Sequence, residues 1–408
     1  MVTNYKKVDA AAMNKMNKVH ILRLIHNRQT ISRSDIVKIT GLTPPTVSRI
    51  VDQLINEDGL VKYIGIGDSN GGRPPAMLAF NGNENYVIAI DLGATLIRGM
   101  LSDLNNDIQM EIQISTDLEK GYEAVMDNVA TVVNRLLKRR GLNINKVLGV
   151  GIGVAGLVDI NKGMIDFSPD FGWESVNINN SLSQRLSLPF VFDNSTRLMA
   201  LGELNFGLGK KFSNFIVINI GYGIAAGIVI DGKTIYGADG KAGEFGHMIV
   251  DQNSHIQCKC GTYGCLEALA SGRRIAALGQ ELFNSKKSTL LTELCNNDPN
   301  LIDAKLVFEA AQSGDSNANE ILEKVLNYVG IGIANLVNLL DPEVIFMGGG
   351  VSSNGEMFFN PLKKAIQCYL ISRKKELDIK PTTFVDYATL TGAFSLVVDK
   401  IIRLESLR

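Results

Sequence analysis

The sequence has little of what a membrane or exported protein needs. No apolar run approaches the roughly 20 residues of a membrane span, and the polar start MVTNYKKVDAAAMNKMNK has no signal-peptide core. Only five of 408 residues are cysteine, and three of these fall within eight residues, whereas Cys295 and Cys368 stand alone. Without export signals, such a cluster is more typical of a metal site than of a disulfide framework. We therefore predict a cytoplasmic protein with no membrane partner.

The charge of the chain is almost balanced overall but not along its length. The formal net charge is -1, yet residues 1–80 contain eleven basic and six acidic residues. The remaining residues contain 30 basic and 36 acidic ones. A chain of this length is expected to form two or three domains. The charge distribution therefore indicates a basic N-terminal head followed by an acidic body. The charge alone fits an anionic partner for the head and a merely solvated surface equally well.

Residues 17–80 have the pattern of a winged helix-turn-helix. Two segments with apolar residues at helical spacing precede TGLTP, where Gly41 allows a tight turn. Thr43 then caps a third helix, and Pro44 occupies its first turn. The residues expected to face the core are Ile21, Leu24, Ile25, Ile36, Val37, Ile39, Val47, Ile50, Val51 and Leu54. The following GLVKYIGIGDSNGGRPPAMLAFN reads as two strands around a glycine-rich tip, which is the wing.

Polar residues remain on the outer side of the third helix. Thr43, Thr46, Ser48 and Arg49 are expected at its start, where this motif presents side chains to the major groove. Arg49 is the candidate for direct base contact, and Arg73 in the wing is a candidate for the minor groove or a phosphate. A small protein-interaction domain is the alternative. The turn, the outward polar set and the wing together favour DNA binding.

The chain after Asn81 is an α/β body with an internal duplication. Two segments have the pattern of a strand-turn-strand unit with a glycine-rich turn, YVIAIDLGATLIRGMLSDL and FIVINIGYGIAAGIVIDG. Each is followed later in the chain by a strand with a glycine-rich end, in KVLGVGIGVAGLVD and DPEVIFMGGGVS. Helices are expected near 120–140, 268–283 and 317–340. Several such turns in order are stronger evidence than one. They predict two similar lobes that close over a cleft.

Two motifs carry a resemblance to a known family. The segment GKAGEFGHMIV, followed by CKCGTYGCLEALASG, resembles the zinc and sugar motif of the ROK family (repressors, open reading frames and sugar kinases). The join GGRPPAMLAFN between wing and body is similar to that of the family's repressor branch. The resemblance implies an actin/hexokinase-like (ribonuclease H-like) two-lobed α/β body behind the winged helix-turn-helix. It implies a DNA-binding domain at 1–82, a first lobe at 83–195, and a second lobe at 196–389 with the zinc site and dimer interface. A C-terminal helix at about 390–408 would return to the first lobe.

The resemblance also implies a structural Zn²⁺ and a sugar site beside it. Three sulfurs and one nitrogen form a closed tetrahedral set, and the implied ligands are His247, Cys258, Cys260 and Cys265. His255 competes by proximity in the sequence, but the resemblance favours His247. In similar proteins this histidine also faces the sugar, so the metal fixes its ring. Asn194, Glu244 and Glu267 would complete the sugar contacts.

The kinase chemistry of the family is expected to be lost. Counting back from Gly202 and Glu203 in VFDNSTRLMALGE places Ser195 where similar kinases have the catalytic aspartate, and a serine is no base without an activator of its own. Tyr222 stands where the second phosphate loop of the kinases has threonine. The loop residues that remain are read as vestigial, and they are Asp91, Gly93, Thr95, Gly221, Gly223 and Gly349. We therefore expect no catalytic residues.

These readings converge on a sugar-responsive repressor. Its expected partners are operator DNA and a monosaccharide inducer, and it is expected to be a homodimer or a dimer of dimers. One alternative is a ROK sugar kinase that carries a DNA-binding head. A second is a regulator whose body binds a sugar-transport protein. The sequence does not distinguish xylose from glucose, an amino sugar or a sugar phosphate.

Overall fold

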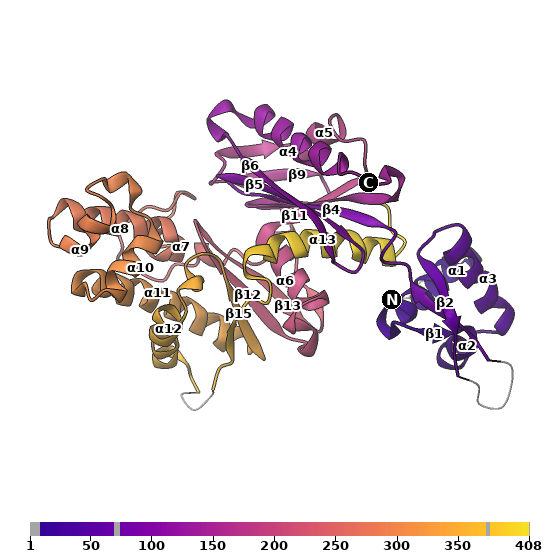
Figure 1. The fold of residues 1–408 in the computed structure, drawn as a ribbon. Coiled ribbons are helices and arrows are strands. Elements are labelled where there is room, and N and C mark those ends of the chain that lie inside the picture. The colour runs from indigo at the N-terminus through magenta and orange to yellow at the C-terminus, as the bar shows by residue number, and fades with distance from the viewer. Residues whose placement is uncertain (1–8, 69–73, 373–375, 408) are drawn as a thin grey trace, which may run out of the picture.

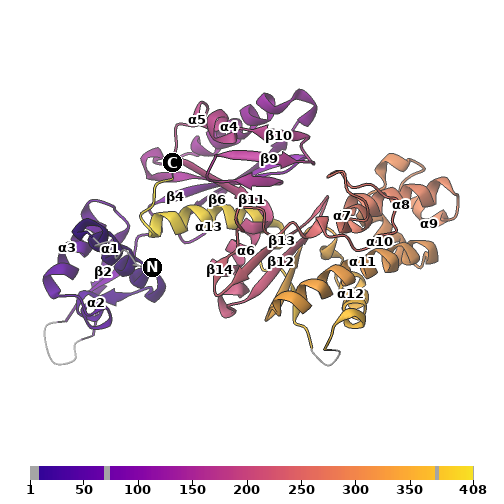
Figure 2. The ribbon, with the colours of Figure 1, turned by 180° about the vertical axis from the view of Figure 1, so that it is seen from behind.

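The computed structural model describes residues 9–68, 74–372 and 376–407. It consists of a small head followed by two lobes, which are joined by a long C-terminal helix (Figures 1 and 2). No helix within these residues is long and apolar enough to cross a membrane. Arg73, which was expected to contact DNA from the wing, lies outside the described residues.

The head has the order expected of a winged helix-turn-helix. Its elements are α1 (Ala10–Arg28), β1 (Ile31–Ser32), α2 (Arg33–Thr40), α3 (Pro44–Asn56), β2 (Val61–Ile66) and β3 (Ala76–Phe80). Gly41 ends α2 in the left-handed region, with φ of 68°, and this allows the turn into α3. The three strands pair in the order β1-β3-β2 and form the wing.

The core of the head is almost the one that the sequence predicts. The four apolar residues expected to face inward from α3 are all fully buried. Ile39 was expected in the core, and this prediction is wrong, because the residue is 46% exposed. The helix α2 has only eight residues, and Ile36 alone is fully buried on it.

The first lobe is built on a five-stranded sheet in the order β11-β7-β4-β5-β6. Its strands are β4 (Tyr86–Leu92), β5 (Leu96–Asp103), β6 (Ile108–Ser115), β7 (Val147–Val154) and β11 (Phe190–Asn194). A small second sheet contains β8 (Leu157–Asp159), β9 (Met164–Ser168) and β10 (Trp173–Val176), and α5 (Ile178–Ser183) follows it. Ile88 and Ile90 of β4 pack toward α4 (Tyr122–Leu137), whereas Val87 and Ala89 face α13 (Ala388–Ile402). Both faces are buried, which explains the unbroken apolar run in this strand.

The second lobe repeats this plan. Its sheet has the order β14-β13-β12-β15-β16, with β12 (Phe215–Ile220), β13 (Ile224–Ile230), β14 (Lys233–Thr234), β15 (Val344–Gly348) and β16 (Ile379–Pro381). In both lobes the central strand pairs antiparallel with the next strand of the chain and parallel with a later one. The helices are α7 (Leu266–Ala270), α8 (Gly272–Asn284), α9 (Thr289–Leu294), α10 (Ala304–Gln312), α11 (Ser316–Leu340) and α12 (Glu356–Tyr369).

Two crossing helices join the lobes. α6 (Ser195–Asn205) packs on β12 and β13 of the second sheet, and α13 packs on β4 and β7 of the first. The C-terminal helix thus lies on the first lobe but spans Ala388–Ile402 rather than about 390–408. Gly202 and Gly392 let the two helices approach closely, because a Cβ at Gly392 would lie 1.9 Å from the Leu198 carbonyl oxygen.

Candidate functional site

The glycine-rich turns follow the central strands of both lobes. Gly93 and Thr95 lie between β4 and β5, and Gly221 and Gly223 lie between β12 and β13. Gly349 follows β15 with φ of 86°, and a Cβ there would lie 2.4 Å from the backbone oxygen of Ile220. Backbone geometry therefore suffices to explain this glycine, whether or not the loop binds a phosphate.

The acidic residue of the first loop already has a cation. The guanidinium of Arg98 lies 2.5 Å from a carboxylate oxygen of Asp91 and also donates to the carbonyl of Asp386. Burial raises the pKa of Asp91, and the charge of Arg98 opposes this effect. A metal ion of a nucleotide would compete with Arg98 for this carboxylate.

The start of α6 holds the segment that would carry a catalytic base. Ser195 is the first residue of the helix, and Asn194 is its N-cap, with Oδ1 accepting from the amides of Thr196 and Arg197. The Asn194 amide group donates to the carbonyl of Gly156. This leaves one amide hydrogen of Asn194 for a ligand.

The carboxylate nearest to Ser195 in the sequence is buried and paired. Asp193 lies 2.8 Å from the guanidinium of Arg197, and the two side chains are only 1% and 3% exposed. Arg197 also donates to the carbonyl of Gly240 and stacks on the ring of Tyr236 at 4.6 Å. Asp193 is therefore buried and bound by Arg197.

Three of the four expected sugar contacts come together in the second lobe. His247 directs Nε2 toward Glu244, with 3.9 Å between the ring nitrogen and a carboxylate oxygen. Burial raises the pKa of Glu244, while the charges of His247 and Arg197 lower it. Glu267 is buried on α7 and accepts from the backbone amide of Ile224 at 2.9 Å. The fourth residue, Asn194, lies at the start of α6.

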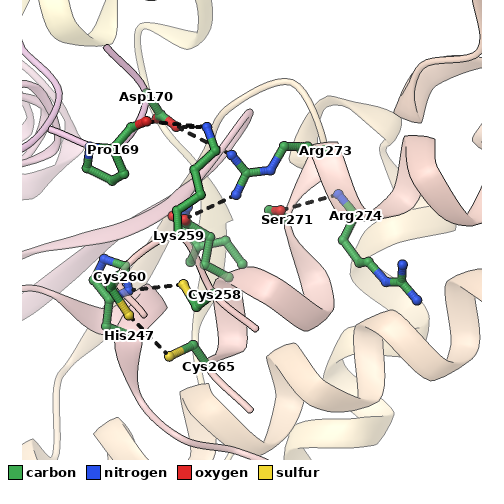
Figure 3. A network of polar contacts seen from close by, with 12 residues as sticks. Pro169, Asp170, His247, Cys258, Lys259, Cys260, Cys265, Ser271, Arg273 and Arg274 are labelled. Carbon is green, nitrogen blue, oxygen red and sulfur yellow. Dashed lines mark hydrogen bonds and ion pairs between the residues drawn. The ribbon is translucent and has the colours of Figure 1, made fainter. Parts of the chain in front are cut away.

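The histidine and cysteine cluster has the geometry of a metal site (Figure 3). The ligand atoms of His247, Cys258, Cys260 and Cys265 all lie within 4.8 Å of one another. Nδ1 of His247 is 3.6 Å from the Cys258 sulfur, and the sulfurs of Cys260 and Cys265 are 3.8 Å apart. Tetrahedral bonds of about 2.3 Å to sulfur and about 2.0 Å to nitrogen separate ligand atoms by roughly 3.5–3.8 Å. His255 is exposed and does not belong to the cluster.

The acidity of the cluster suits a cation. Burial would raise the pKa of the Cys260 thiol, but hydrogen bonds from Thr262 and the neighbouring thiols outweigh it and lower the pKa to about 7. The hydrogen bond with Cys258 raises the pKa of His247 to about 9. Burial raises the pKa of the Cys265 thiol to about 12. The Cys260 sulfur is therefore the one that most readily becomes a thiolate, whereas Cys265 and the His247 ring would have to release a proton to bind a metal ion.

The sequence did not reveal a second group of charges beside this cluster. Lys259 and Arg273 both lie 5.2 Å from the ring centre of Tyr222, and both approach Asp170 in the turn between β9 and β10. Tyr222 is 52% exposed and lies in the glycine-rich turn between β12 and β13. These residues come from four separate segments, and no spacing in the sequence links them.

The outer side of α3 carries the residues expected to contact DNA. Thr43 and Arg49 are exposed, whereas Thr46 and Ser48 are half-buried. The hydroxyls of Thr43 and Thr46 are 2.9 Å apart, and Arg49 donates to Asn14 of α1 at 2.6 Å. A DNA base would compete with Asn14 for this guanidinium.

The fold and the site together define a transcription regulator built on a sugar-kinase-like body. Residues 87–400 match the model of the ROK family, and residues 15–62 match that of the MarR family. The chain belongs to the ROK family. It is 33% identical over 394 residues to a putative xylose repressor of Caldicellulosiruptor sp. strain Rt8B.4, covering 96% of this chain and 98% of the relative.

Kinases of the family match a smaller share of this chain. A glucokinase of Halalkalibacterium halodurans is 31% identical and covers 71% of this chain and 88% of its own. The structure of a Streptomyces griseus glucokinase has a TM-score of 0.69 at 30% identity and covers 76% of this chain and 99% of its own. A ROK transcriptional regulator, a homologue of the E. coli MLC protein, has a TM-score of 0.81 at 24% identity, covering 96% and 97%. The last likeness, which includes the head, concerns the fold.

Proposed function

We propose that this protein is a transcriptional repressor that binds operator DNA and is released from it by a monosaccharide. The observation that carries the proposal is the winged helix-turn-helix joined to a duplicated ROK body, together with the match to a xylose repressor along 96% of the chain. The exposed polar side of α3 is the proposed DNA-reading surface, with Arg49 as the base-contacting residue. D-Xylose is the first inducer to test, since xylose repressors of Bacillus subtilis and of Caldicellulosiruptor bescii also match over 96% of the chain.

The proposed inducer site combines sugar contacts with a structural zinc. His247, Cys258, Cys260 and Cys265 would hold Zn²⁺ and thereby fix the orientation of the histidine ring. Nε2 of His247, the carboxylates of Glu244 and Glu267 and the free amide hydrogen of Asn194 would bind sugar hydroxyls. The separate directions of Nδ1 and Nε2 support this double use of one imidazole.

The body is proposed to be catalytically silent. Ser195 stands in place of a base, Asp193 is neutralised by Arg197, and Asp91 is neutralised by Arg98. Phosphoryl transfer needs both a positioned base and a free metal-binding carboxylate. Dimerisation, or a dimer of dimers, would place two heads on one operator in the cytoplasm, and a sugar-transport protein is a further candidate partner.

One set of measurements tests this proposal. Thermal shifts of the zinc-loaded protein are recorded with D-xylose, other monosaccharides and sugar phosphates, each with and without Mg-ATP. The affinity for a duplex selected from random sequences is then measured with and without the stabilising sugar. We expect one sugar to stabilise the protein without ATP and to weaken its binding to DNA. The substitution Glu244→Gln should abolish both effects, whereas the control substitution Glu281→Gln on α8 should leave them unchanged. Sugar-dependent consumption of ATP would instead identify a kinase.

A further inference from the structure

A group of charged side chains spans the space between the two lobes (Figure 3). Asp170 belongs to the first lobe, in the turn between β9 and β10, whereas Lys259 and Arg273 belong to the second. Oδ1 of Asp170 lies 3.5 Å from Nζ of Lys259 and 3.7 Å from Nη1 of Arg273. Closing or opening of the lobes would therefore change these distances directly.

Arg273 is the member of this group that also contacts the proposed inducer site. Its Nη2 lies 3.6 Å from Oε1 of Glu267. Both distances from the guanidinium to a carboxylate exceed those of a good hydrogen bond. Nη1 of Arg273 and Oε1 of Glu267 are buried and have no hydrogen-bond partner. One guanidinium is thus shared between a carboxylate of each lobe and is fully bonded to neither.

The surroundings restrict how this guanidinium can move. The ring of Tyr222 lies against it, and the same ring lies against Lys259 from the neighbouring loop. Arg273 is at the start of α8, where Ser271 caps the helix, so its backbone is fixed. The side chain can therefore shift between Glu267 and Asp170 across the face of Tyr222, while its Cα stays in place.

We propose that Arg273 couples the inducer site to the arrangement of the lobes. A sugar hydroxyl that donates to Oε1 of Glu267 weakens the attraction of this carboxylate for Arg273. The guanidinium then shifts toward Asp170 and draws the first lobe onto the second. Arg273 is a positioning residue in this scheme, and Lys259 holds Asp170 within its reach. The inference rests on the proposed function and adds the pair of residues that transmits the signal.

The test measures coupling rather than binding alone. Coupling is the ratio of the operator Kd with saturating inducer to the operator Kd without it, and values of about 5 to 150 are common for linked sites. We expect Arg273→Met and Asp170→Asn each to reduce this ratio by at least about 5-fold, while operator binding without sugar stays near that of the wild type. The double variant should lose no more than the single ones, because both changes break one link.

The neighbouring residue supplies a matched control. Arg274 lies on the same helix but pairs with Glu281 at 3.1 Å, away from the lobe junction, so Arg274→Met should keep the wild-type ratio. Melting temperature and zinc content are measured for every variant, and Arg273→Lys is used if the methionine variant does not fold.

The outcomes separate the inference from the function on which it rests. If the wild type shows no sugar-dependent change in operator affinity, the proposed function fails. If the wild type responds and the Arg273 and Asp170 variants respond equally, only the coupling role is wrong. If Arg273→Met loses sugar binding but Asp170→Asn keeps the full ratio, Arg273 serves Glu267 alone and the link between the lobes is refuted.

Discussion

The buried ion pair between Asp193 and Arg197 allows a stability prediction with a definite size. The change is Arg197→Met, which keeps much of the apolar stem and removes the guanidinium. Asp193 would then lack its cation in a site where its side chain is 1% exposed. Breaking a buried pair from one side costs about 3–5 kcal/mol, because the remaining charge is uncompensated. The variant also loses the hydrogen bond to Gly240 and the contact with Tyr236.

Urea unfolding, followed by circular dichroism, measures this loss. We expect the free energy of unfolding of the body to fall by about 3–5 kcal/mol in Arg197→Met. Adding Asp193→Asn should recover part of the loss, since the double variant no longer buries a charge. Gly240 precedes the segment that carries Glu244, so sugar affinity should fall as well. A loss below about 1 kcal/mol, the range of an exposed pair, would refute the reasoning.

Three further predictions concern other parts of the chain. Cys260→Ser should release zinc and lower both the melting temperature and the sugar affinity. Cys368 is exposed, so Cys368→Ser should leave the zinc content, the melting temperature and the sugar affinity unchanged. Metal analysis and calorimetry measure these quantities. His26 has a pKa lowered by burial. The free energy of unfolding should therefore fall as the pH drops from about 6.5 through the lowered pKa, because the unfolded chain binds the proton more readily. In urea unfolding at pH 7.5 and 5.5, the decrease between the two pH values should be smaller for His26→Gln than for the wild type. Gly349→Ala should destabilise the body by about 1–3 kcal/mol, because the residue has a positive φ and the new Cβ would clash with backbone atoms. Gly350 has open space around it, so Gly350→Ala should cost less than about 1 kcal/mol in the same assay.

Much of the candidate site could be predicted because its residues are local in the sequence. His247 and the three cysteines lie within 19 residues, in a motif that resembles one of the ROK family. The helix-turn-helix could also be predicted from the sequence, because Gly41 and Pro44 mark its turn and the spacing of apolar residues shows which face of each helix is buried. Ile39 was misplaced because periodicity does not show where a short helix stops contacting its core.

The partners of the charged residues could not be predicted. Arg98 and Arg197 were not recognised as the cations that neutralise Asp91 and Asp193. The resemblance placed Asn194 among the sugar contacts but did not show that capping α6 uses most of its hydrogen-bonding capacity. Each of these contacts depends on the orientation of a side chain, on which composition and spacing carry no information.

The sequence by itself determined the winged head and the duplicated body, and a family resemblance supplied the candidate metal ligands. The pattern of the head and of the body arises from local rules, namely helical spacing and glycine at tight turns. Only the tertiary structure decided that Arg273 lies between Glu267 and Asp170. Asp170 is far from Glu267 and Arg273 along the chain and belongs to the other lobe, and it meets them because the two lobes are held together by the crossing of α6 and α13.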